Sequence, residues 1–325
     1  MLIFSLFDER GLLMKKYIIL LVLLITSCTQ FNKFNKLYKA TDYDNAIIEL
    51  NKIIQSDSLN YSAYHKLGKC YLAKEKINPA MQAFKKAYEL GKNSNNSTML
   101  KQSFLNSRIM LGDSLVNTKD LYKARQEYLY AFELDTSNTT CLKKLGDLYY
   151  NMGRLDDSKT FYERLITQIP SDTHSLGKLD SIQVRSELST VELQKGIKLF
   201  EAYNYSKSLE HFEKSLSYKQ DNIDSKYYQS LTNGAILYNK GSKKQLWDSI
   251  EHFGKAMMYR PNSGEPHFYM GMAYEKKDRR EFDSAIEQYK LAIQKEPDGY
   301  FNNYCQKKIR ELTTLRDRLN KFWKK

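Results

Sequence analysis

Proline, glycine and cysteine are all scarce in this chain of 325 residues, which has 5 Pro, 14 Gly and 4 Cys. Few prolines and glycines argue against collagen-like, linker-rich and turn-dense all-β designs. Four cysteines, with no C-x-x-C pair among them, are too few for a disulfide scaffold. Tyrosine is abundant, with 25 residues, and Lys plus Arg exceed Asp plus Glu by 13. This excess permits a surface that binds acidic groups, but it names no substrate.

Long apolar runs are also missing, because none reaches the roughly 20 residues that a membrane-spanning helix needs. The run Tyr17–Ile25 has nine residues, follows Lys15 and Lys16, and precedes Thr26-Ser27-Cys28. A basic patch, a short apolar core and small residues are typical of a secretory signal peptide. We therefore predict a signal peptide over residues 1–27, whose natural start is Met14 rather than Met1.

The end of this signal, Leu24-Ile25-Thr26-Ser27-Cys28, resembles the lipobox of bacterial lipoproteins. The resemblance implies that Cys28 is lipidated and becomes the first residue of the mature chain. Two or three acyl chains, palmitate among them, give stable membrane anchoring. An ordinary signal peptide with a chance cysteine, or an uncleaved anchor, is the alternative reading.

No acidic residue follows Cys28 directly, since the next residues are Thr29 to Asn32. By resemblance, this disfavours both retention in the inner membrane and export to the cell surface. The expected location is the periplasmic face of a bacterial outer membrane, with a lipid anchor.

The remaining chain repeats a helical pattern. A small residue recurs seven times, with a large apolar residue three positions before it and another four positions after it. These offsets define one face of a helix. Spacings of 34, 44, 34, 50, 41 and 36 separate the small residues, which are Ala46, Ala80, Ala124, Ser158, Ser208, Ser249 and Ala285.

Within Tyr61–Lys92, the residues Leu67-Gly68, Tyr71, Ala80, Phe84 and Ala87 match the spacing of the tetratricopeptide repeat (TPR), a 34-residue helix–turn–helix. The chain therefore resembles TPR proteins. This resemblance implies an all-α fold, a TPR-type α-solenoid that winds as a right-handed superhelix of helix–turn–helix repeats. Glycines of the first helices recur at Gly68, Gly112, Gly146, Gly196 and Gly271.

The spacings that are longer than the 34-residue repeat predict where the array is interrupted, and so predict the domain organisation. We expect an N-terminal array of about four repeats over 28–170, a joint at 171–188, and a C-terminal array of about three repeats over 189–297. The polar stretch 91–98 predicts a loop or broken helix, and Gly241–Lys244 and Asp278–Glu281 predict enlarged turns.

Residues 298–325 predict a basic capping helix, because the last repeat of a solenoid otherwise exposes an apolar face. Its apolar side would hold Ile309, Leu312, Leu315, Leu319 and Phe322. Its cations predict either a solvated face or contact with anionic lipid headgroups, cell-wall polymer or an acidic protein.

No catalytic motif is present. The five histidines, His65, His174, His211, His252 and His267, form no H-E-x-x-H and no zinc-type cluster with cysteine. Nucleophile-elbow, Walker and dinucleotide glycine patterns are absent too. We therefore predict a protein that is not an enzyme and has no cofactor or metal. Cys70, Cys141 and Cys305 are expected to be free, partly buried thiols.

In TPR proteins the inner face is built mainly from first-helix positions two, five, nine, twelve and thirteen. The resemblance carries this role to His65, Lys69, Asn106, Asp113, Lys143, Asp147, Tyr150, Asn151, Phe268 and Met272. Their mixture of aromatic, amide and charged groups suits a peptide or protein segment better than a compact apolar ligand. The Lys/Asn clamp of eukaryotic chaperone-tail binders is not reproduced.

These features predict a non-catalytic, membrane-anchored scaffold or adaptor that binds a protein or peptide partner in a bacterial envelope complex. Nucleic acid is not an expected partner. The alternative is a module that binds cell-wall glycan or regulates a wall enzyme, and a third reading is an enzyme hidden in the repeats. Carboxylates and aromatics ringing the inner face would favour glycan, whereas a hydrophobic groove would favour peptide or protein.

Overall fold

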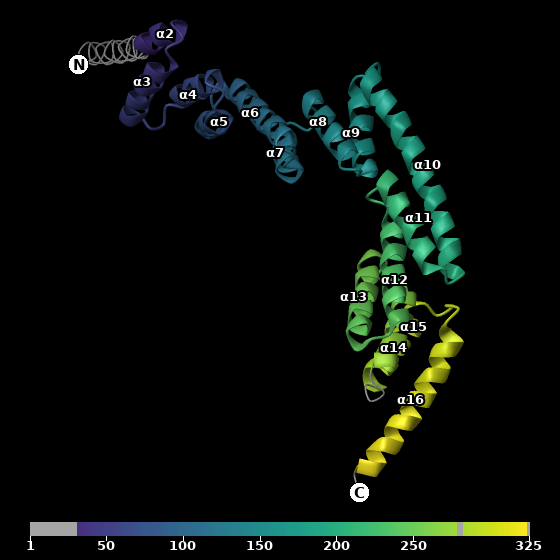
Figure 1. Ribbon diagram of the computed structural model, residues 1–325. Coiled ribbons are helices and arrows are strands. Elements are labelled where there is room, and N and C mark those ends of the chain that lie inside the picture. Colours follow the sequence, from purple (N-terminus) through teal and green to yellow (C-terminus); the bar gives the residue numbers. More distant parts are fainter. Residues whose placement is uncertain (1–30, 278–281, 324–325) are drawn as a thin grey trace, which may run out of the picture. The chain divides into compact units, whose positions relative to one another are not determined.

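The computed structural model describes residues 31–277 and 282–323, with side chains through Phe322 (Figure 1). Within these residues it contains fifteen helices and no strand, which confirms the predicted all-α class. The signal peptide, Cys28 and the turn Asp278–Glu281 lie outside the described residues. The helices are α2 Asn32–Lys39, α3 Tyr43–Ser56, α4 Tyr61–Ala73, α5 Ile77–Gly91, α6 Ser97–Asn117, α7 Leu121–Leu134, α8 Thr139–Asn151, α9 Leu155–Gln168, α10 Thr173–Glu201, α11 Tyr205–Tyr218, α12 Ile223–Lys240, α13 Lys243–Tyr259, α14 Glu265–Lys277, α15 Phe282–Lys295 and α16 Asn302–Trp323.

The chain divides into two compact units, Met1–Leu145 and Gly146–Lys325, and the boundary falls inside α8. The sequence placed a joint elsewhere, at 171–188. In the structure residues 173–188 are the first part of the 29-residue helix α10. Asp172 caps this helix by accepting a hydrogen bond from the backbone N–H of Ser175 at 2.9 Å, so the stretch is helical rather than a loop.

Successive helices pack as hairpins, α4 with α5, α6 with α7, α10 with α11, α12 with α13, and α14 with α15. At each crossing a first-helix glycine meets an aromatic ring of the second helix. A Cβ atom at Gly112 would lie 2.3 Å from the ring of Tyr128, and one at Gly196 would lie 2.5 Å from Phe212. Gly234, which the sequence analysis missed, stands in the same relation to Phe253 at 2.3 Å. Only glycine allows these close approaches.

The recurring small residues are all fully buried at these crossings. Where the residue is serine, its hydroxyl donates a hydrogen bond to the carbonyl oxygen of the glycine on the first helix. The distances are 2.8 Å for Ser158 to Gly146, 2.9 Å for Ser208 to Gly196, and 2.8 Å for Ser249 to Gly234. A buried hydroxyl is therefore satisfied within its own hairpin, as burial of a polar group requires.

Where the structure describes the turn inside a hairpin, the turn is short and one of its residues lies in the left-handed region. These residues are Thr41, Glu75, Lys119, Gly153, Tyr203 and Gly241, with φ between 57° and 76°. The expected enlarged turn Gly241–Lys244 is only Gly241 and Ser242, because Ser242 caps α13 in a capping box with Gln245. The residues by which this repeat exceeds the usual length belong instead to its two helices, α12 with 18 residues and α13 with 17. Residues 92–96 form a non-helical turn between α5 and α6, in agreement with the loop or broken helix predicted over 91–98, and α6 is 21 residues long.

The helix α16 caps the last hairpin. Cys305 and Leu312 are buried in a cluster with side chains of α15, and Lys308 and Arg316 form ion pairs with Glu275 and Asp283, both at 2.7 Å. The predicted apolar side is only half used, since Leu315, Leu319 and Phe322 are 46%, 36% and 71% exposed. At about 1.5 Å per residue, α16 is about 33 Å long and α15 about 21 Å, so the last turns of α16 extend past its partner.

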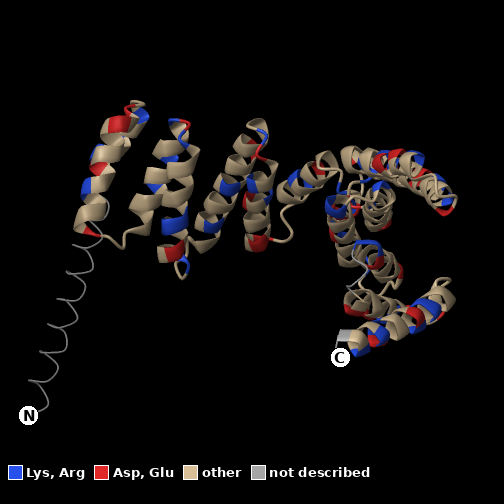
Figure 2. Ribbon diagram, turned by 60° about the horizontal axis from the view of Figure 1, so that its bottom comes forward, with Lys and Arg blue, Asp and Glu red and all other residues tan. Residues whose placement is uncertain are grey.

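Positions of Lys and Arg alternate with positions of Asp and Glu along the helices (Figure 2). The thiols of Cys70, Cys141 and Cys305 are free, as predicted, and fully rather than partly buried. Burial raises their pKa values to about 11, 12 and 11.

Among the described helices, none combines the length and the apolar character needed to cross a membrane.

Candidate functional site

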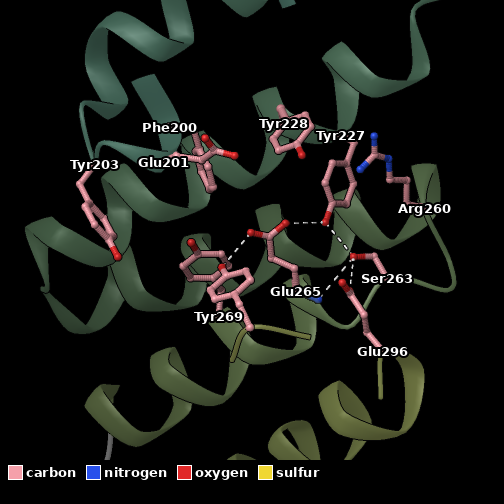
Figure 3. A pocket seen from close by; sticks show the side chains of 11 residues that line it. Phe200, Glu201, Tyr203, Tyr227, Tyr228, Arg260, Ser263, Glu265, Tyr269 and Glu296 are labelled. Carbon is pink, nitrogen blue, oxygen red and sulfur yellow. Dashed lines mark hydrogen bonds between the residues drawn. The ribbon is translucent and has the colours of Figure 1, made fainter. Parts of the chain in front are cut away.

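A cavity of about 450 Å³ in the second unit is the strongest candidate site (Figure 3). Its volume lies within the range of about 300–1,000 Å³ that ligand pockets occupy. Five of its side chains are tyrosines and three are glutamates. The lining residues are Phe200, Glu201, Tyr203, Tyr227, Tyr228, Arg260, Ser263, Glu265, Tyr269, Glu296 and Tyr300. We call this cavity the tyrosine pocket.

The tyrosine pocket is built from the ends of several helices. α10, α12 and α14 are the first helices of three successive hairpins, and each contributes side chains near one terminus. The crossing glycine of each first helix is position eight of its repeat. In this numbering Tyr228 and Glu265 are at position two of their repeats, and Phe200 and Glu201 are at positions twelve and thirteen of theirs. These are inner-face positions of the repeat. Tyr203 and Tyr300 come instead from the turns before α11 and α16.

Glu265 lies at the centre of the pocket (Figure 3). Its carboxylate accepts hydrogen bonds from the hydroxyl of Tyr227 at 3.0 Å and from that of Tyr300 at 2.9 Å. Burial, and to a smaller extent the nearby carboxylate of Glu296, raise the pKa of Glu265, against the opposing effect of the two tyrosine hydrogen bonds. The site therefore holds a carboxylate whose charge is poorly solvated.

A second set of hydrogen bonds fixes the wall next to Glu265. The Glu296 carboxylate accepts from the backbone N–H of Gly264 at 3.0 Å, and the Ser263 and Tyr227 hydroxyls lie 2.9 Å apart. Burial raises the pKa of Tyr227 and Tyr269 far above the ordinary tyrosine value. Both hydroxyls therefore stay protonated, and that of Tyr227 keeps its role as a donor to Glu265.

Arg260 is the cation of the lining. Its guanidinium donates to Asp224 Oδ1 from Nε at 3.1 Å and from Nη2 at 2.8 Å. It also lies over two rings of the pocket, 4.4 Å from the Tyr227 centroid and 5.2 Å from the Tyr228 centroid. Its charge is thus already matched by Asp224, which does not line the cavity.

The far wall is aromatic. Phe200 meets Tyr228 and Tyr269 edge to face, with ring centroids 5.9 Å and 6.2 Å apart. Tyr203 stands at the rim with 77% of its surface exposed, and Glu201 is exposed beside it. The pocket therefore offers ring faces and carboxylate oxygens together.

None of the ten inner-face residues predicted from sequence lines the tyrosine pocket. In the first unit, His65 is 6% exposed, and its Nε2 lies 3.0 Å from Ser103 Oγ. Burial lowers the pKa of His65 to about 4. Asn106 accepts from Gln102 Nε2 at 2.8 Å, and Lys69 is exposed. Lys143 is half-buried.

The predicted carboxylates bind partners within their own unit. Asp113 accepts from the Tyr128 hydroxyl at 2.5 Å and pairs with Lys144 at 2.8 Å. Asp147 accepts from the Tyr162 hydroxyl at 2.6 Å and lies 2.7 Å from His174 Nε2. Both side chains therefore hold the aromatic residue of the following helix, a role that spacing alone did not indicate.

The remaining predicted residues lie in the second unit. The ring of Tyr150 has Lys178 Nζ 4.0 Å from its centroid, and Asn151 is exposed. Phe268 stacks on Phe301 at 5.3 Å, and Met272 packs against the α15–α16 cluster. The role of all ten as binding residues stays a prediction. Position counting extended to α10 and α12 would have found Phe200, Glu201 and Tyr228.

No group of three or more His, Cys, Asp or Glu side chains in the described part of the chain is arranged to hold a metal ion.

Two segments, residues 61–93 and 144–172, match the family model described as the tetratricopeptide repeat. A TPR repeat-containing protein of Methanocaldococcus jannaschii is 25% identical to this chain in a match that covers 84% of this chain and 52% of the relative. The chain thus spans about half the length of this curated relative.

Two solved TPR structures are also similar to this chain. One, the TPR2AB domain of yeast Sti1 in complex with pHSP90, is 14% identical, with 89% of this chain and 98% of that chain covered and a TM-score of 0.36. The other, a tetratricopeptide repeat protein from Parabacteroides merdae, is 12% identical, with 88% and 98% covered and a TM-score of 0.36.

TPR proteins typically mediate binding of proteins or peptides, and their repeats are in general non-catalytic scaffolds. Residues 61–93 and 144–172 are thus matched as tetratricopeptide repeats, and the described helices form an all-helical array of this repeat type.

Proposed function

We propose that the protein is a non-catalytic scaffold that binds a protein or peptide partner through the tyrosine pocket of its second unit. The observation that carries this proposal is the placement of Tyr228, Glu265, Phe200 and Glu201 at inner-face positions of three successive first helices. Side chains that point into one cavity from successive hairpins can contact an extended segment over several residues. Aromatic rings there supply contact area at low conformational cost.

We propose further that the scaffold is anchored by lipid at Cys28 and works in a bacterial envelope complex, on the periplasmic face of the outer membrane. This part rests on the lipobox resemblance of Leu24–Cys28 and on the signal that precedes it. Acyl chains contribute about 0.8 kcal/mol per buried CH₂, so two chains would hold the protein firmly. Metabolic acyl labelling of the wild type and of Cys28→Ser tests it, and label that persists in the variant contradicts the anchor.

A photo-crosslinking amino acid at Tyr203 tests the binding role. Tyr203 is 77% exposed at the pocket rim, so the probe is tolerated and faces any occupant. Met258, 79% exposed on the second helix α13, is the matched control position. We expect irradiation of intact cells to give a defined protein adduct from position 203 and none from position 258. Equal labelling from both positions, or none from 203, contradicts the proposal.

The alternative, binding of cell-wall glycan, is favoured by one specific feature, the combination of carboxylates and tyrosine rings in the pocket. Sugar hydroxyls donate to carboxylates, and sugar faces pack on aromatic rings. Cosedimentation of the purified protein with peptidoglycan sacculi separates the two functions. Pelleting that is lost in Glu201→Gln would favour the glycan function.

A further inference from the structure

The charge of the tyrosine pocket is unbalanced. Three carboxylates line it, those of Glu201, Glu265 and Glu296, against the single guanidinium of Arg260. That guanidinium donates two hydrogen bonds to Asp224 outside the lining. Among the described residues, none of the three glutamates has a cationic side chain within ion-pair distance. Arg260 also favours the charged form of Glu265 electrostatically. The lining nevertheless holds three acidic side chains and one cation, although the whole chain has a formal net charge of +13.

The central carboxylate is held in a fixed position. Tyr227 and Tyr300 donate to the two different oxygens of Glu265, at 3.0 and 2.9 Å. These neutral donors orient the carboxylate without neutralising it. A buried charge is costly unless it is paired, and a cationic group in the cavity would supply the missing partner.

The ring faces favour the same kind of ligand. A cation over the face of a tyrosine is attracted by the ring quadrupole, and the wall already contains one example, the Arg260 guanidinium over Tyr227 and Tyr228. Tyr203 and Tyr269 add further rings to the lining. An anionic group would meet three carboxylates, and a purely apolar group would leave them unpaired.

We propose that the tyrosine pocket binds a positively charged side chain, Lys or Arg, of an extended peptide. This inference rests on the proposed peptide-binding function and specifies what the pocket recognises. The ammonium or guanidinium group lies between Glu265 and Glu201, and the aliphatic stem packs on the rings of Phe200 and Tyr269.

Saturation-transfer NMR on the full chain in detergent tests the proposal with five-residue probe peptides. The probes carry Lys or Arg at the centre of a glycine peptide, and matched probes carry norleucine or Glu there. We expect the Lys and Arg peptides to bind at least about tenfold more tightly than the norleucine peptide, because only they place a cation beside the carboxylates. Equal binding of the norleucine peptide, or preferred binding of the Glu peptide, overturns the proposal.

Two variants locate the binding. Glu265→Gln removes the central charge, and Glu201→Gln removes the exposed rim charge and keeps the test decisive if the buried substitution disturbs folding. Each is expected to reduce Lys-peptide binding several-fold, whereas Glu213→Gln, at an exposed position of α11, should not. An equal loss in Glu213→Gln, or no loss in Glu201→Gln, contradicts the site.

An oligomer of N-acetylglucosamine serves as the competing probe. If it binds in the pocket and the Lys peptide does not, the cation inference is wrong and the glycan function is favoured. Failure of the inference is distinguishable from failure of the proposed function. A protein adduct from position 203 that Glu201→Gln and Glu265→Gln leave unchanged would keep the scaffold function and reject cation recognition.

Discussion

The two units use the same hairpin but differ in what they bury. In the first unit the small residue at the helix crossing is alanine in each hairpin, Ala46, Ala80 and Ala124. In the second unit it is serine in three hairpins, and each serine donates to the carbonyl of the crossing glycine. The crossing position thus requires a small side chain. Either alanine or serine is accommodated there, provided that the serine hydroxyl donates a hydrogen bond.

The cavity of the second unit is also lined by more polar side chains than the cavity of the first unit. A cavity of about 310 Å³ in the first unit is lined by Tyr64, Leu67, Tyr71, Pro79, Gln82, Ala83 and Lys86, with no carboxylate. The tyrosine pocket of the second unit has three carboxylates. The repeat sets the packing between helices, and the side chains outside that packing give each unit its own chemistry.

The largest expected effect tests whether both units obey the same size limit. Gly112→Ala in the first unit and Gly234→Ala in the second would each place a Cβ 2.3 Å from an aromatic ring. We expect each to lower the free energy of unfolding by up to about 3 kcal/mol, as overpacking does. Chemical denaturation of the full chain, with hydrogen exchange to locate the effect, measures it.

Gly254→Ala is the matched control, because a Cβ there would have nothing within 4 Å. It should be neutral or stabilising by up to about 1 kcal/mol, since alanine is the better helix former. A loss of stability in Gly254→Ala equal to that in Gly234→Ala would contradict the role of the crossing glycines.

The hairpin register could be predicted from the sequence because it depends on local size at fixed offsets, such as Ala80 and Phe84 on one helix. Gly234 escaped because the long helices α12 and α13 place it 15 residues before Ser249, whereas Gly196 precedes Ser208 by 12. The joint at 171–188 rested on a polar composition that the structure instead accommodates in the long helix α10.

The tyrosine pocket was harder to predict, for a physical reason. Its residues come from the ends of different helices and from two turns, so their convergence depends on how neighbouring hairpins stack. Tyr203 and Tyr300 have no place in the repeat numbering. Conversely, His65 was predicted at a binding face. In the structure α6 packs against the α4–α5 hairpin, and Ser103 of α6 contacts the buried imidazole of His65.

The second prediction concerns the stability of the first unit, which we expect to fall in mild acid because of His65. The pKa of His65 in the folded first unit is about 4, below the ordinary value of 6.5. The unfolded chain therefore takes up the proton first, and the stability contributed by neutral His65 falls as the pH decreases from 6.5 towards 4. The shift sets an upper bound of about 3 kcal/mol, and we expect about 2 kcal/mol after local relaxation.

Hydrogen exchange of peptides from α4 and α6 between pH 7 and pH 4, corrected for intrinsic rates, measures this loss. His65→Gln should remove the pH dependence of these peptides in that window. A protection pattern in α4 that is independent of pH in the wild type would show that His65 is not buried as neutral imidazole.

The third prediction concerns acid sensitivity of the second unit at lower pH. Glu192 is buried and lies within 2.9 Å of Lys195 and 2.8 Å of His211. Hydrogen bonds from His211 and Lys195 lower the pKa of this carboxyl to about 2. Its contribution is therefore complete above the ordinary value of 4.5 and is lost as the pH falls through about 2.

Because Lys195 is half exposed, we expect only about 1–2 kcal/mol from this carboxylate at neutral pH. Glu192→Gln should lower the stability of α10 and α11 by that amount at pH 7 and leave it nearly unchanged at pH 2. If the variant and the wild type respond to acid in the same way, the carboxylate is not the group that titrates.

The smallest effect tests the comparison most directly, by exchanging the crossing residues between units. Ser208→Ala removes a buried donor and leaves the carbonyl of Gly196 without that partner, which should cost about 1 kcal/mol. Ala124→Ser places a hydroxyl in the first unit at the same distance of 12 residues from its crossing glycine, Gly112, as Ser208 has from Gly196. The hydroxyl can then donate to the Gly112 carbonyl, so we expect a change within about 0.5 kcal/mol. Thermal and urea unfolding of the two variants and of the double variant measure both values, and the two effects should add because the sites lie in different units. A loss above about 2 kcal/mol in Ala124→Ser would mean that the first unit cannot satisfy the hydroxyl, and that its alanines are required by more than size.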